Sequence, residues 1–177
     1  MGRVQPVPSA ALVAGITFAD ETVLNRVMQK LTEKFGSLTL HSEVFDFTMT
    51  DYYTAEMGEN LRKGFYCFER PISVGELPDI KLFTNDSEME FVRRDTENPS
   101  RTVNIDPGYV TLSKLVLATT KDYSHRTYIG KGIYGEVTLH YIKGTFTPFS
   151  HTYPDYQTPI AIEFFNQVRD FVKMNIT

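Results

Sequence analysis

The first predicted elements are a short apolar strand and an amphipathic helix. Residues 12–18 are almost entirely apolar, which is typical of a buried strand. In the next segment apolar residues recur at intervals of one, three or four, at Val23, Leu24, Val27, Met28, Leu31 and Phe35. This spacing places them on one face of a helix. We expect Asp20 to cap the start of this helix and Gly36 to end it.

Three further segments are predicted before residue 100. Residues 38–47 indicate a second strand, and their apolar positions change parity part-way, which is typical of a bulge. Residues 64–70 are short, aromatic and followed by proline, so we expect a third strand. Residues 76–94 favour a helix with a break, because Ser87 and Glu90 have the spacing of a capping box that starts a second helix.

The second half predicts several strands and a closing helix. Residues 101–105 and 115–119 are apolar enough for strands, although 111–118 could equally form one or two turns of helix. Residues 127–142 predict a hairpin around a Gly-Lys-Gly turn. Residues 158–172 begin with Thr-Pro and carry an apolar stripe, so they predict the last helix.

This order of elements favours an α+β fold, with a mostly antiparallel sheet and helices packed on it. One form of it is a ferredoxin-like core with an added C-terminal hairpin and helix. The chain has 177 residues, 41% of them hydrophobic, and lacks internal repeats or a linker-like stretch. We therefore expect a single α+β domain over residues 1–177.

Composition excludes several classes of protein. A single cysteine, Cys67, cannot form an intramolecular disulfide, so nothing requires an oxidising compartment. A formal net charge of -4 argues against a general nucleic-acid coat protein. No apolar run reaches the roughly 18–20 residues of a membrane helix, so we expect no membrane partner and a cytoplasmic protein.

Charge is distributed unevenly along the chain. Residues 1–100 carry 10 basic and 16 acidic side chains, whereas residues 101–150 carry 6 basic and 3 acidic ones. The basic segment also holds five tyrosines, Tyr109, Tyr123, Tyr128, Tyr134 and Tyr141. Cations interleaved with aromatic rings suit an anionic ligand with a flat part, such as a nucleotide or a single-stranded RNA end. The alternative is that these lysines are solvated strand and turn residues.

The segment 119–126 is the strongest candidate for chemistry, because a run of polar and aromatic residues follows an apolar strand there. Lys121 and Arg126 could clamp a phosphate or carboxylate. His125 could move a proton near neutral pH, with Asp122 orienting it. The same residues could instead form a self-satisfied turn, in which Asp122 caps local amides and Arg126 pairs with an acid.

Two other segments predict turns. Residues 104–109 contain Asp-Pro-Gly, which favours a type II turn. If the strand continues there, Asn104 and Asp106 share one face and could both enter a pocket. Residues 153–156 indicate a turn before the last helix, in which Asp155 could form a pocket wall.

Several motifs that would indicate a particular cofactor or metal are absent. Residues 130–135 match the spacing G-x-G-x-x-G, but they lie in a predicted hairpin rather than at the start of a helix. No P-loop pattern is present, and the four histidines lack the spacing of zinc sites. The sequence thus indicates no metal and no particular cofactor.

Four polar motifs follow one another in the second half of the chain: Asn-Ile-Asp-Pro-Gly-Tyr at 104–109, Leu-Ala-Thr-Thr-Lys-Asp-Tyr-Ser-His-Arg at 117–126, Gly-Ile-Tyr-Gly-Glu-Val-Thr-Leu at 132–139 and Thr-Tyr-Pro-Asp-Tyr at 152–156. In this order they resemble an uncharacterised bacterial family, domain of unknown function 4416. The resemblance implies a small, stand-alone cytoplasmic protein whose signature is polar and carried by loops. It implies no reaction.

The leading hypothesis is a pocket at one end of the sheet for a phosphorylated small molecule or nucleotide, with or without His-assisted turnover. The candidate catalytic residues are His125 and Asp122, and the candidate ligand-binding residues are Asn104, Asp106, Lys121, Arg126 and Asp155. A non-catalytic module that binds a protein partner or a second copy of itself is the alternative, and RNA-end binding is a third.

Overall fold

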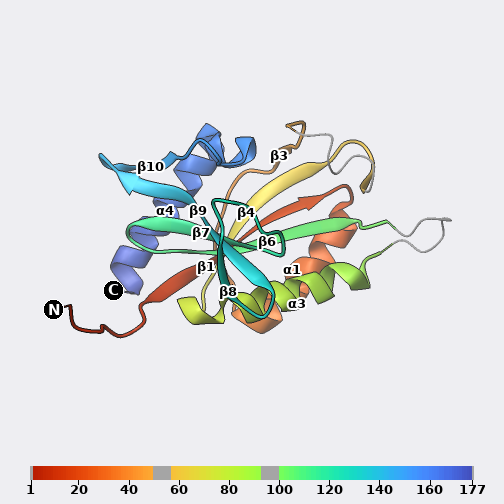
Figure 1. Ribbon diagram of the computed structural model, residues 1–177. Coiled ribbons are helices and arrows are strands. Elements are labelled where there is room, and N and C mark those ends of the chain that lie inside the picture. The colour runs from red at the N-terminus through yellow and green to blue at the C-terminus, as the bar shows by residue number, and fades with distance from the viewer. Residues whose placement is uncertain (1, 50–56, 93–99, 177) are drawn as a thin grey trace.

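The computed structural model describes residues 2–49, 57–92 and 100–176, and most of this length forms one antiparallel sheet with helices on it (Figure 1). The strands are β1 (Ser9–Phe18), β2 (Leu38–His41), β3 (Phe45–Asp46), β4 (Arg62–Phe68), β5 (Ile72–Ser73), β6 (Val103–Val110), β7 (Lys114–Thr119), β8 (Thr127–Gly130), β9 (Ile133–Ile142) and β10 (Thr145–Pro148). The helices are α1 (Glu21–Phe35), α3 (Leu77–Glu90) and α4 (Pro159–Asn175), with the short 3-10 helices η1 (Val74–Glu76) and η2 (Pro154–Gln157).

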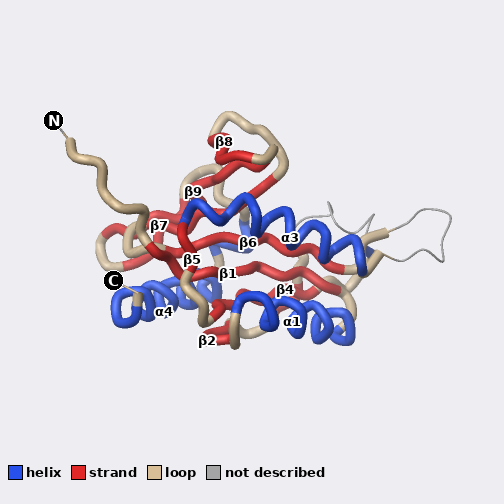
Figure 2. Tube along the Cα trace, turned by 90° about the horizontal axis from the view of Figure 1, so that it is seen from below, coloured by secondary structure: helices blue, strands red, loops and turns tan. Residues whose placement is uncertain are grey.

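The main path of the sheet runs β10-β9-β7-β6-β1-β4-β2. Alternate residues of the central strand β1 face opposite sides: Leu12 packs in the cluster with α1 and α3, and Val13 packs in the cluster with α4. The sheet is therefore buried on both faces, with α1 and α3 over one and α4 over the other (Figure 2). The predicted α+β class and mostly antiparallel sheet are confirmed, and the ferredoxin-like form stays a prediction.

The two amphipathic stripes give the expected helices. The Asp20 side chain accepts from the Thr22 N–H at the start of α1, and Gly36 follows its last residue. Thr158 caps α4 by accepting from the Ala161 N–H. In both helices the apolar stripe faces the sheet, so the buried face and the capped start both match the sequence prediction.

Two predictions on the first half are wrong in detail. The predicted break at Ser87 does not occur, because α3 continues to Glu90 and the Ser87 hydroxyl donates to the Phe83 carbonyl one turn earlier. The end of that predicted helix, at 93–94, lies outside the described residues. Residues 38–47 form two short strands instead of one, and both pair with β4. The irregularity predicted there is present as a shift of register between Leu38 and Leu40.

The predicted tight turn around Pro107 is also wrong. Pro107 and Gly108 lie inside β6, where they pair with Ala14 and Val13 of β1. Strand pairing overrides the local turn preference because β1 offers a partner along the whole of β6. The open alternative of a helix over 111–118 is wrong, because residues 111–113 are irregular and strand β7 begins at Lys114.

The predicted hairpin is confirmed as β8 and β9. Gly130 pairs with Ile133, and the two residues between them, Lys131 and Gly132, have φ of 56° and 77°. Positive φ at both central residues is the geometry of a type I′ turn, whose twist suits adjoining strands.

The single cysteine provides a test of the core. Cys67 is fully buried on the α4 side of the sheet, and burial raises the pKa of its thiol to about 12. Because the thiolate is the reactive form, we expect iodoacetamide to leave Cys67 unmodified in the folded protein at pH 8. Mass spectrometry after the same treatment in concentrated guanidinium chloride should show full modification. Rapid modification without denaturant would contradict this packing.

Candidate functional site

The sheet face under α4 changes from apolar to polar along its strands. Phe65 and Cys67 of β4 pack in the apolar cluster with α4, and the next residue on the same face towards the start of the strand is Lys63. On β6, Val110 belongs to that cluster, whereas Asp106 and Asn104 on the same face do not. One end of this face is thus built from polar side chains.

A cavity of about 590 Å³ lies at this polar end. It falls within the range of about 300–1,000 Å³ that is common for small-molecule sites. Its lining comes from β4, α3, β6, β7, β9 and η2 and from the loops beside them: Phe47, Met49, Lys63, Lys81, Asn85, Glu88, Arg101, Asn104, Asp106, Leu117, Ala118, Thr119, Thr120, Lys121, Tyr123, Arg126, Glu136, Tyr153, Pro154, Asp155 and Tyr156.

Strand β7 separates from β6 beside this cavity. The ladder between them ends at Gly108 and Leu117, next to Pro107, which has no N–H to donate. The backbone of Ile105 is satisfied instead by α3. Its N–H donates to Glu88 Oε1 at 2.7 Å, and its carbonyl accepts from Lys81 Nζ at 2.9 Å. Side chains of α3 therefore occupy the position where a strand would continue.

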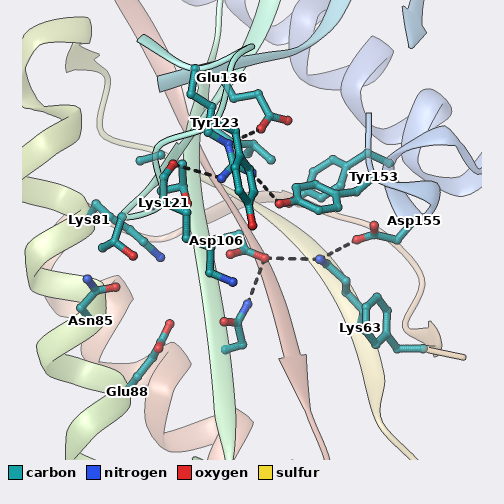
Figure 3. Close-up of a pocket in the computed structure, with 18 of the residues that line it drawn as sticks. Lys63, Lys81, Asn85, Glu88, Asp106, Lys121, Tyr123, Glu136, Tyr153 and Asp155 are labelled. Carbon is teal, nitrogen blue, oxygen red and sulfur yellow. Dashed lines mark hydrogen bonds and ion pairs between the residues drawn. The ribbon is translucent and has the colours of Figure 1, made fainter. Parts of the chain in front are cut away.

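Lys63 lies between two carboxylates from distant parts of the chain (Figure 3). Its Nζ is 2.6 Å from Asp155 Oδ2 and 3.5 Å from Asp106 Oδ2, and its side chain is 3% exposed. Burial alone would lower the pKa of Lys63, but the charges of Asp155 and Asp106 outweigh burial and raise it. The ammonium also lies over the ring of Tyr156, 4.8 Å from its centre. Lys63 is therefore a fixed positive charge.

A chain of hydrogen bonds extends from Asp106 to α3. Asn104 donates from Nδ2 to Asp106 Oδ2 at 3.0 Å, and Arg101 Nη1 donates to Asn104 Oδ1 at 3.3 Å. Arg101 Nη1 also lies 3.0 Å from Glu88 Oε2. Burial raises the pKa of the Glu88 carboxyl, and the charge of Lys81 offsets part of that effect.

Arg126 joins the loop after β7 to β9 and η2. Its Nε donates to Glu136 Oε2 at 2.8 Å, its Nη1 to the Lys121 carbonyl at 3.1 Å and its Nη2 to Tyr153 Oη at 2.6 Å. The guanidinium also lies 4.4 Å from the ring centre of Tyr123. Arg126 thus pairs with an acid, as the structural interpretation of this loop predicted.

The structure brings all five predicted ligand-binding residues together. The cavity lining includes Asn104, Asp106, Lys121, Arg126 and Asp155. They come from β6, the loop after β7 and η2, so the folded sheet alone makes them neighbours. The prediction that Asn104 and Asp106 share a strand face is confirmed by their hydrogen bond.

The two predicted catalytic residues lie outside this lining. His125 Nε2 is 3.1 Å from Glu136 Oε2, and its ring stacks on His151 with centres 4.5 Å apart. Asp122 is exposed. The carboxylate that contacts His125 is therefore Glu136 rather than Asp122, which corrects the expected pairing.

Sequence reasoning missed Lys63, Lys81, Glu88 and Glu136. Lys63 had a signal, because it precedes Phe65 and Cys67 at inward positions of a strand. Lys81, Asn85 and Glu88 had another, because spacings of four and three place them on one helix face. Neither pattern predicts which residues these side chains contact across the cavity.

The cavity lining is rich in both charges but forms no metal site among the residues that the structure describes. No group of three or more His, Cys, Asp or Glu side chains in that part of the chain could hold a metal ion. Likewise, none of the described helices is both long and apolar enough to cross a membrane.

Comparison with known families agrees with the motifs that line the cavity. The family model described as a domain of unknown function, DUF4416, matches residues 8–171. The chain belongs to this family. The DUF4416 match runs from β1 into α4 and includes every residue that lines the cavity. No curated protein and no solved structure matches the chain.

Proposed function

We propose that the protein binds a small phosphorylated molecule with a flat ring, of the nucleotide class, in this cavity. The observation that carries the proposal is the environment of Lys81. Its side chain is buried in the lining, and its Nζ donates to the uncharged carbonyl of Ile105. The charge of Glu88 acts on this ammonium at longer range, but no direct ion pair joins Lys81 to a carboxylate of the described residues. Two of its three N–H donors therefore remain for an anion.

The overall charge of the described lining supports the same ligand class. It contains five Lys and Arg side chains against four Asp and Glu side chains, in a protein whose formal net charge is -4. Lys63, Arg101 and Arg126 each pair with a carboxylate of the lining. The positive excess suits an anionic group such as a phosphate.

Two tyrosines supply a surface for the flat part of such a ligand. Tyr123 and Tyr153 both belong to the lining and are about half exposed, at 54% and 46%. Exposed aromatic rings beside cations are the usual setting for stacking a base. Figure 3 shows Tyr123 and Tyr153 on the same side of the cavity as Arg126's partner Glu136.

Turnover of the ligand and cellular location belong to this proposal as well. His125 lies outside the lining but contacts Glu136, which belongs to it, so a proton that His125 moves during turnover would pass by way of the Glu136 carboxylate. We also propose a cytoplasmic protein of bacterial origin, in keeping with a single buried cysteine and the family resemblance.

Thermal unfolding with a panel of compounds tests the proposal. The panel comprises the four ribonucleoside monophosphates, ribose 5-phosphate, inorganic phosphate and a short single-stranded RNA. A ligand at about 100 times its Kd stabilises the fold by about 2.7 kcal/mol, which should raise Tm by roughly 5–10 °C for a chain of this size. We expect such a shift with at least one phosphorylated compound.

Variant Lys81→Met should lose most of the shift, measured against its own Tm without ligand. Lys131→Met is the matched control, because Lys131 forms an exposed ion pair with Asp79 away from the cavity. It should respond like the wild type. Equal shifts in wild type and Lys81→Met, or none with any compound, would contradict the proposed site. A shift with RNA alone would favour RNA-end binding.

A further inference from the structure

Asp106 presents one of its carboxylate oxygens to the cavity. Both described partners of this side chain, Asn104 Nδ2 and Lys63 Nζ, contact the same atom, Oδ2, at 3.0 and 3.5 Å. Its Oδ1 has no partner among the described residues. The side chain is 27% exposed in the cavity lining, so Oδ1 is an acceptor that a ligand can reach.

Lys63 and Asn104 fix the direction of that acceptor. Because both donors bind Oδ2 from one side, the carboxylate plane is held and Oδ1 is directed away from Lys63. Figure 3 shows Lys63 and Asp155 on one side of Asp106, and the α3 side chains Lys81, Asn85 and Glu88 on the other. Asp106 therefore lies between the fixed charge of β4 and the helix that carries the proposed anion-binding residue.

Asn85 adds a second uncommitted group on that side. It lies one helical turn after Lys81 and lines the cavity half-buried. Its amide makes no hydrogen bond within the part of the chain that the structure describes. An amide offers both a donor and an acceptor, so it can bind a hydroxyl in either direction.

We propose that the ligand is a ribonucleotide whose ribose diol is bound by Asp106 Oδ1 and the Asn85 amide, while its phosphate contacts Lys81. This inference rests on the proposed function and names the part of the ligand that gives specificity. One ribose hydroxyl donates to Asp106 Oδ1, and its neighbour exchanges a hydrogen bond with Asn85. A ligand ammonium could also donate to Asp106, but the excess of cations in the lining disfavours a second positive charge.

The discriminating experiment is calorimetric titration of each ribonucleoside monophosphate and its 2′,3′-dideoxy analogue. Each pair shares its base and phosphate, so the difference in Kd reports the hydroxyls alone. The dideoxy analogue cannot form the hydrogen bond to the charged Asp106 carboxylate. We therefore expect the analogue to bind the wild type about 10- to 100-fold more weakly than the ribonucleotide does.

Variant Asp106→Asn should remove most of this difference. Its amide must turn its NH₂ away from Lys63 and Asn104, which places a donor where the ribose hydroxyl needs an acceptor. Lys63 still pairs with Asp155, so the fold should be retained. The ribonucleotide should then bind only slightly more tightly than its dideoxy analogue, through the hydroxyl that Asn85 binds. Asp79→Asn, the same change in an exposed residue, should preserve the wild-type difference.

The outcomes separate this inference from the proposed function. Equal affinity of wild type for ribonucleotides and dideoxy analogues would overturn the diol assignment and leave the phosphate site intact. A full hydroxyl preference in Asp106→Asn would overturn it too. If no ribonucleotide binds but a sugar phosphate shifts Tm through Lys81, the inference fails, and of the proposed function the phosphate site at Lys81 stands while the flat ring does not. If nothing in the panel binds, both fail.

Discussion

Replacing Lys63 with methionine should lower the free energy of unfolding by about 3–5 kcal/mol, the usual cost of removing one partner from a buried ion pair. Methionine fills similar space but leaves Asp155, 6% exposed, and Asp106 without their shared cation. The two carboxylates would then repel each other where water is scarce. A domain is stable by only about 5–15 kcal/mol, so this loss is large.

Urea denaturation of the purified variants measures this effect. Lys131→Met is the control, since its exposed ion pair with Asp79 should contribute at most about 1 kcal/mol. The double variant Lys63→Met/Asp155→Asn should regain about 1–3 kcal/mol relative to Lys63→Met, because it removes the more deeply buried carboxylate. A loss below about 1 kcal/mol in Lys63→Met would show that the two aspartates do not depend on this cation.

Arg126→Met should be destabilising to a similar extent, by about 3–5 kcal/mol. Arg126 and Glu136 have side chains that are 1% and 3% exposed, and the other oxygen of Glu136, Oε1, has no hydrogen-bond partner among the described residues. Without the guanidinium, the charge of Glu136 is left with His125 as its contact. The substitution also removes the hydrogen bonds to the Lys121 carbonyl and Tyr153, which join residues of the cavity lining.

Arg62→Met is the matched control for Arg126→Met. Arg62 pairs with Glu21 at 2.7 Å, but both side chains are substantially exposed, so the loss should be at most about 1 kcal/mol. Adding Glu136→Gln to Arg126→Met should recover part of the stability, because the buried charge disappears. If Arg126→Met and Arg62→Met unfold at the same urea concentration, the buried Arg126–Glu136 ion pair does not stabilise this loop.

Predictions from the sequence are most accurate where the local pattern of residues agrees with their burial in the fold. The stripes from Val23 to Phe35 and from Ile160 to Val172 became α1 and α4 because their apolar faces cover opposite sides of one sheet. The hairpin at Lys131–Gly132 was predictable because its turn needs positive φ, which favours glycine. All five predicted ligand-binding residues line the cavity, since the polar run at 119–126 follows an apolar strand and Asn104 and Asp106 alternate on one strand face.

Prediction was weakest where a distant strand decides the local structure. Asp-Pro-Gly at 106–108 has the chemistry of a turn, yet pairing with β1 keeps it extended. The importance of Lys63 was hidden for a related reason. Its partners, Asp106 and Asp155, lie 43 and 92 positions further along the chain, and no local pattern relates them. His125 was paired with Asp122 because that residue is near in sequence, whereas Glu136 reaches it across a β hairpin.

We propose that a phosphorylated ligand binds at the polar end of the sheet, between α3 and η2. Amide hydrogen exchange with and without a saturating mixture of ribonucleoside monophosphates tests this claim, because it locates binding on the backbone. Slower exchange confined to α3, β6, residues 119–126 and η2 is the result we predict. Protection elsewhere, such as along β10 or β2, or no change in any segment, would contradict the claim.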